Sequence, residues 1–151
     1  MRLFDNYRLW QLVLAAMAIP LALIAFWPSP VDKPVSRQIS WVLTFLHHHG
    51  IPNWFDYGTV ESSANVVMFV PVGFAAALAF PSKHWLQIGA FGLLVSGCIE
   101  LGQLLFLHDR FAALSDMATN TTGAMLGAAI ASLLRGKSIA RSKRHGRSTF
   151  P

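Results

Sequence analysis

One carboxylate lies within the longest apolar stretch of this chain. Glu100 is the only charged residue between Trp85 and Leu107, a run long enough for a helix to cross a hydrocarbon core of about 30 Å. A carboxylate near the middle of such a helix costs about 2.5 to 3.5 kcal/mol on insertion scales. Glu100 is therefore the first candidate for ligand binding or acid–base chemistry. The alternative is a structural role, in which it is hydrogen-bonded in its neutral form or paired with Arg110.

Other polar residues are spaced so that they would meet Glu100. Helical steps of three or four place Gly89, Gly92, Ser96 and Gln103 on its face, and the next apolar segment carries polar residues in the same way. These side chains are predicted to converge on one outward-opening pocket. The candidate ligand-binding residues are Asn65, Glu100, Gln103, Arg110, Asp116 and Asn120.

Each candidate also has a structural interpretation. Asn65 and Asp116 stand where helix N-caps are expected, because each begins an apolar segment. Gln103 and Asn120 suit hydrogen bonds between helices, which contribute about 1 kcal/mol in a bilayer. The three consecutive histidines, His47 to His49, point in different directions on a helix and have no nearby partner ligand, so we expect no metal site.

The composition indicates a membrane protein. The 151 residues are 54% hydrophobic and only 13% charged, about half the charged fraction of soluble domains. Four apolar segments predict an all-α, compact bundle of four transmembrane helices in a single domain, residues 1–151. The approximate spans are 9–27, 64–80, 85–107 and 117–134, followed by a basic tail, residues 135–151, that we expect to be disordered.

Lysine and arginine are distributed unevenly between the two ends of this predicted bundle. The end with both termini holds nine of them: Arg2, Arg8, Lys83, Arg135, Lys137, Arg141, Lys143, Arg144 and Arg147. The opposite end holds Lys33, Arg37 and Arg110. The positive-inside rule therefore predicts that both termini are cytoplasmic. The basic tail is expected to meet anionic lipid of the inner leaflet rather than nucleic acid.

Two further features concern packing. Within the first outer loop, residues 34–47 predict a short helix at the membrane interface, anchored by Trp41 and Trp54. Small residues predict close helix contacts, and the simplest arrangement packs the stripe around Gly89 and Gly92 against that of the last span. The predicted packing residues are Pro71, Gly73, Gly123 and Gly127, with Pro71 able to kink its helix.

Three ordered elements resemble a known family. Residues 65–73, NVVMFVPVG, are similar to the N-x-x-x-F-x-P-x-G signature of VanZ-like membrane proteins. Glu100 and Gln103 follow, and then Arg110, Asp116 and the segment from Asn120 to Gly127, in the order of that pattern. The resemblance covers about residues 62–131. It implies a protein of the bacterial inner membrane acting on the cell envelope, since the family is named for a protein associated with low-level teicoplanin resistance.

Two classes of function fit these observations. The first is a binding module for a membrane lipid or a lipid-linked cell-wall component, which could lower susceptibility to teicoplanin. The second is an intramembrane enzyme on such a substrate, with Glu100 as general acid or base and Arg110 binding an anionic group. No cofactor is expected, because the sequence contains no Gly-rich phosphate loop and no zinc-type spacing of Cys and His.

Overall fold

In the computed structural model every regular element of the described residues is a helix, which confirms the all-α prediction. The structure describes residues 4, 6–27, 33–107 and 114–147, the last eleven of these by backbone only. The elements are α1 (Tyr7–Ala25), the short 3-10 helix η1 (Lys33–Val35), α2 (Ser36–His48), α3 (Tyr57–Ala79), α4 (Trp85–Phe106) and α5 (Leu114–Arg147).

Three of the described helices are long and apolar enough to cross a membrane. They are α1, α3 and α4, with 19, 23 and 22 residues. Helix α5 contains the fourth predicted span, residues 117–134, but it is not among these three. Its bundle segment carries many Gly, Ala, Ser and Thr residues, which give little hydropathy and suit packing against other helices.

Side chains that cap backbone N–H groups explain where two of these helices begin. Asp56 accepts a hydrogen bond from the N–H of Thr59 at 2.9 Å, and α3 starts at the next residue. His84 starts α4 with a reciprocal capping box. Helix α3 thus begins seven residues before the predicted span at 64. The N-cap interpretation of Asn65 is wrong, because Asn65 lies two turns inside the helix.

Helix α3 lies at the centre of the bundle. Its second half is almost completely buried, with Phe69 and Leu78 among the best-covered side chains. Helix α1 covers one side, where the rings of Trp10 and Phe74 meet edge to face with centroids 5.7 Å apart. The helix continues through Pro71, which is exposed on its outer side. The core therefore forms around a run of small residues that lets other helices approach closely.

The glycines of α5 pack against α3, not against α4 as the sequence analysis expected. A Cβ at Gly123 would collide with the backbone carbonyl of Val66, and one at Gly127 with that of Val70. The small residues of α4 do meet α5, but at other positions: a Cβ at Gly92 would lie 2.6 Å from the Cβ of Ala124. One side of α5 thus packs against α3, and the adjacent side of α5 packs against α4.

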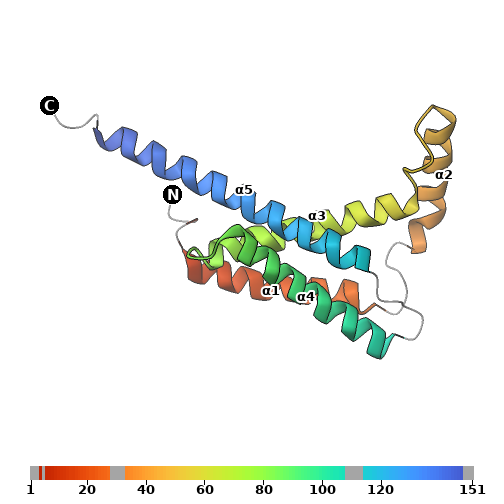
Figure 1. The fold of residues 1–151 in the computed structure, drawn as a ribbon, viewed down its shortest axis with the longest axis horizontal. Helices are drawn as coiled ribbons and strands as arrows, with labels where there is room; N and C mark the ends of the chain where they lie inside the picture. Colours follow the sequence, from red (N-terminus) through yellow and green to blue (C-terminus); the bar gives the residue numbers. More distant parts are fainter. Residues whose placement is uncertain (1–3, 5, 28–32, 108–113, 148–151) are drawn as a thin grey trace.

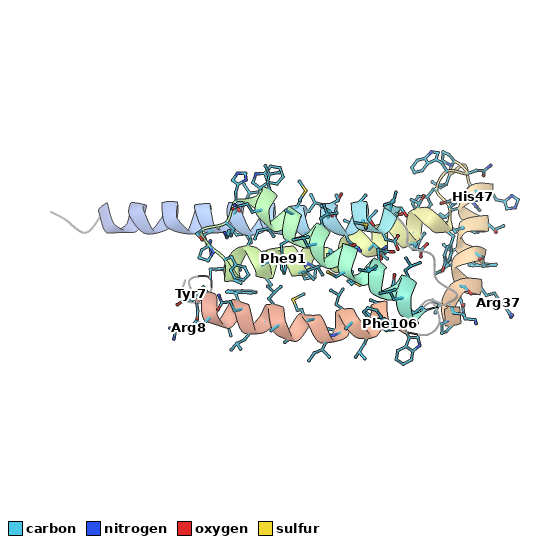
Figure 2. The ribbon with its side chains drawn as sticks, turned by 60° about the horizontal axis from the view of Figure 1, so that its bottom comes forward. Tyr7, Arg8, Arg37, His47, Phe91 and Phe106 are labelled. Carbon is cyan, nitrogen blue, oxygen red and sulfur yellow. The ribbon has the colours of Figure 1, made fainter. Side chains whose placement is uncertain are left out.

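Helix α2 stands across one end of the bundle, roughly perpendicular to the other helices (Figure 1). Its Leu43 is buried, and Ile39 and Leu46 are half-buried. Trp41 and Trp54 remain largely exposed. Figure 2 shows Arg37 and His47 on this helix, at the opposite end of the molecule from Tyr7 and Arg8.

Helix α5 extends far beyond the other helices at the end where the N-terminus lies (Figure 1). Its 34 residues correspond to about 50 Å at about 1.5 Å per residue, well above a core thickness of about 30 Å. The sequence predicts a disordered tail from residue 135, whereas in the structure residues 135–147 continue the helix. The remaining tail residues, 148–151, lie outside the described part of the chain.

Candidate functional site

Four polar side chains are buried between helices in the half of the bundle nearer α2. They form what we call the buried polar layer: Ser96, Glu100 and Gln103 on α4 and Asn120 on α5. Their exposed fractions are 0%, 5%, 8% and 5%. The spacing of three or four residues keeps the α4 members on one face. The sequence placed all four near each other, but it did not identify Ser96 as a site residue.

Asn120 and Ser96 join α5 to α4. The Nδ2 group of Asn120 donates to the Ser96 hydroxyl oxygen at 2.9 Å. The other amide atom of Asn120, Oδ1, is buried without a hydrogen-bond partner among the described residues. A buried acceptor in this state costs about 1 to 3 kcal/mol. The layer can therefore accept a hydrogen bond from a water molecule or from a polar ligand.

Gln103 joins α4 to the end of α1. Its Nε2 group donates to the backbone carbonyl of Ala25 at 2.8 Å. Ala25 is the last residue of α1, so this bond satisfies one of the carbonyls that a helix leaves open at its C-terminus. The Phe26 ring packs directly against Gly102, where a Cβ would lie 2.7 Å from it. This hydrogen bond between α4 and α1 is the structural role that the sequence analysis gives as the alternative for Gln103.

An open cleft of about 520 Å³ lies between the first turns of α3 and α5. We call it the outer cleft, and its lining is polar. Its lining contains the three carboxylates of Asp56, Glu61 and Asp116 and the five hydroxyls of Thr59, Ser62, Ser63, Ser115 and Thr119. Gly58 and Val66 complete the lining. Of the predicted ligand-binding residues that the structure describes, only Asp116 lines it. The hydroxyls were missed, although Ser62 and Ser63 lie within three residues of the segment, residues 65–73, that resembles the family signature.

Hydrogen bonds organise the edges of the outer cleft. The pKa of Asp56 is held below its usual value by the backbone N–H of Thr59 and then by the Thr59 hydroxyl, which donates to the same carboxylate oxygen at 3.1 Å. On α5 the Ser115 hydroxyl lies 3.4 Å from an oxygen of Asp116. Asp116 is within the first turn of α5, where the helix dipole favours a negative charge.

The other predicted residues are distributed around these two features. Asn65 is half-buried on α3, next to Val66 of the cleft lining. Glu100 is in the buried polar layer, and Figure 2 places Phe106, one and a half turns further along α4, towards the α2 end. Arg110, the predicted partner of Glu100, lies outside the described residues. Among the described residues no group of His, Cys, Asp or Glu could hold a metal ion.

The fold and this site together define a class: an all-helical membrane protein with several apolar helices and a polar layer buried between them. Comparison with family models gives the family. The VanZ/LLP1 model matches residues 11–135, most of the chain, so this protein belongs to the VanZ/LLP1 family. The resemblance seen in the sequence is thereby confirmed. Neither the curated proteins nor the solved structures contain a significant match.

Proposed function

We propose that this chain is a multi-pass protein of the bacterial inner membrane that binds a lipid-linked component of the cell envelope at its outer end. In this proposal α5 is the fourth span, α2 lies at the outer interface and both termini are cytoplasmic. The observation that carries the proposal is the Oδ1 atom of Asn120, a buried acceptor without a partner in the described part of the chain. A polar group of the bound molecule would donate to it.

The outer cleft supports the same interpretation. Its hydroxyls and carboxylates can exchange hydrogen bonds with a polyhydroxylated or amine-bearing headgroup, which is the chemistry of cell-envelope precursors. The apolar sides of the bundle would meet the lipid part of the same molecule. Membership of the VanZ/LLP1 family agrees with an envelope role. A consequence of this function would be reduced susceptibility to teicoplanin.

Drug susceptibility tests this proposal. Teicoplanin has a fatty tail that would hold it at the depth of the outer site, whereas vancomycin has none. Expression of the chain in a sensitive Gram-positive host should raise the inhibitory concentration of teicoplanin more than that of vancomycin. Glu100→Ala and Asn120→Ala should abolish the rise. Cys98→Ala is the matched control on α4, because Cys98 is exposed, and it should keep the rise.

Two results would contradict the proposal. One is an unchanged teicoplanin inhibitory concentration in cells in which the protein is shown to be present in the membrane. The other is an equal rise with the Glu100→Ala and Asn120→Ala variants, since the buried polar layer would then play no part.

The enzymatic alternative rests on the burial of Glu100. A carboxylate that is only 5% exposed, one turn from Ser96 and one from Gln103, has the surroundings of a general acid or base. Glu100→Gln separates the two functions, because glutamine keeps the shape and the hydrogen bonding but cannot transfer a proton. Binding of a lipid-linked precursor should survive in part, whereas turnover would be lost. Retained turnover in this variant would exclude proton transfer by Glu100.

A further inference from the structure

A second cavity lies at the other end of the bundle, where the chain turns from α3 into α4. Its volume is about 230 Å³, and it is enclosed by the end of α3, the start of α4 and α5. The polar side chains among its described lining residues are Lys83, Arg135 and Ser132, and none of those described lining residues is a carboxylate. Trp85 and several small residues complete the wall. We call it the basic cavity.

The electrostatics of the basic cavity favour an anion. Lys83 comes from the α3–α4 turn and Arg135 from α5, so two elements far apart in sequence bring one cation each. Helix α3 ends at Ala79 and helix α4 begins at Trp85, so the negative end of one helix dipole offsets the positive end of the other and the two full charges dominate. Of the described carboxylates, Asp56, Glu61 and Asp116 line the outer cleft at the opposite end. A phosphate group would neutralise this local excess of positive charge.

An apolar groove adjoins the basic cavity. It measures about 310 Å³ and is lined by Trp85, Thr122, Met125, Leu126 and Ala129. Trp85 belongs to both linings, so one side chain separates the cationic space from the apolar one. Along α5, Thr122, Leu126, Ala129 and Ser132 follow steps of three or four and share one face. This row spans about 15 Å, which is half of a hydrocarbon core of about 30 Å.

We propose that the basic cavity and the apolar groove together bind one anionic phospholipid. Its phosphate lies between Lys83 and Arg135, and one acyl chain follows α5 from Trp85 to Thr122. The Ser132 hydroxyl, which donates to the Ala128 carbonyl at 2.9 Å, lies in the same wall and has its oxygen left to accept a hydrogen bond from the headgroup. Basic pockets between transmembrane helices are known to hold anionic headgroups on the cytoplasmic side. The site includes Arg135, the first residue of the basic tail, but it holds one lipid in a defined cavity, which the general attraction of the tail to anionic lipid does not. It does not depend on the function proposed for the outer end.

Native mass spectrometry of the purified full chain tests the site. The probes are dioleoylphosphatidylglycerol, which is anionic, and dioleoylphosphatidylcholine, which is zwitterionic with the same chains. The unmodified protein should retain one phosphatidylglycerol in preference to phosphatidylcholine. Lys83→Gln with Arg135→Gln should weaken this retention about 30-fold, since each cation near the headgroup contributes about fivefold. The control is Lys33→Gln with Arg37→Gln, which removes the same charge at the opposite end and should change retention less than about twofold.

Two further arms identify the ligand. Ala129→Phe fills the apolar groove and leaves both cations in place, so it should also weaken phosphatidylglycerol retention. Millimolar inorganic phosphate should not displace the lipid if both the headgroup and the chain are bound. Displacement by phosphate, or full retention in Ala129→Phe, would overturn the lipid assignment in favour of a site for a free anion. Equal retention of the two lipids, or equal loss in the two charge-neutralised pairs, would overturn the site itself.

Discussion

The Asn120 side chain shows how a single polar residue can serve both stability and binding. One amide atom holds α5 to α4 through Ser96, and the other is left without a partner in the described structure. Removing one partner of a buried hydrogen bond lowers stability more than removing both partners does. The partner that remains is then buried without a hydrogen bond to replace its lost hydration. Stability and binding should therefore respond differently to substitutions at these two positions.

Ser96→Ala should reduce the free energy of unfolding by about 1 to 2 kcal/mol, since it leaves both amide atoms of Asn120 unpaired. Ser96→Ala combined with Asn120→Leu removes both polar partners and keeps the side-chain volume close, so stability should return to within about 0.5 kcal/mol of the original. Thermal unfolding in detergent micelles, followed by circular dichroism, measures both. A double variant that is less stable than Ser96→Ala would show that the bond is not the source of the loss.

Asp56 provides a pH-dependent contribution. Its folded pKa is lowered by the N–H and hydroxyl of Thr59, so the unfolded state binds its proton more tightly than the folded state. The stabilisation is therefore present above the unfolded pKa of about 4 and is lost as the pH falls through the lower folded value. The protection of the amides in the first turn of α3 against hydrogen exchange, relative to the unfolded chain at the same pH, should decrease in that acidic range. Asp56→Asn should remove this pH dependence, and its persistence in the variant would assign it to another group.

At the scale of elements, the packing of α3 on α5 depends on the absence of side chains. Gly73 faces the backbone of Ala124, and Gly127 faces the backbone of Val70 and Phe74, so each helix presents glycine where the other presents main chain. Such close approach brings many backbone atoms into van der Waals contact and drives helix association where lipid gives no hydrophobic preference.

Gly127→Ala should separate α3 from α5 and lower stability by about 1 to 3 kcal/mol, as overpacking does elsewhere. Gly136→Ala is the control in the same helix, because a Cβ there has no neighbour within 4 Å. Alanine has the higher helix propensity, so the control should be neutral or more stable by up to about 1 kcal/mol. Equal behaviour of the two variants in thermal unfolding in detergent would contradict the glycine contact.

The sequence predicted the helices better than it predicted their partners. Apolar runs located α1, α3 and α4, but the start of α3 was placed too late because Glu61, Ser62 and Ser63 interrupt the apolar signal while Asp56 still caps the helix. Spacing on one helix fixes which residues share a face. It does not fix which neighbour that face meets, because the Gly123 and Gly127 pair suits α3 and α4 equally well until backbone positions are known.

The same limit applies to the candidate site. Burial of Glu100, Gln103 and Asn120 follows from their positions in apolar segments, so the sequence could indicate the buried polar layer. The outer cleft combines the first turns of α3 and α5, which are far apart in sequence. Its hydroxyls carry no signal of their own, since serine and threonine are common at helix starts.

At the scale of the whole molecule, the two ends differ in charge and in shape. One end carries α2 across it and holds the carboxylates of the outer cleft, while α5 extends past the other (Figure 1). The topology predicted from the sequence assigns nine of the twelve lysine and arginine residues to the end with the termini. In a bilayer such a distribution orients the protein, because positively charged segments are retained on the cytoplasmic side.

Single cysteines should therefore label from opposite sides of the membrane. In a Cys98→Ala background, Thr59→Cys at the start of α3 should react with an impermeant maleimide added outside intact cells. Ser138→Cys, in the extension of α5, should react only after the membrane is permeabilised. Thr59 precedes the apolar part of α3, and Ser138 follows the apolar part of α5. Labelling of the two positions from opposite sides would therefore also show that α5 crosses the membrane. Labelling of both from outside would place the termini outside or leave α5 unable to span, and protection of Thr59→Cys would invert the bundle.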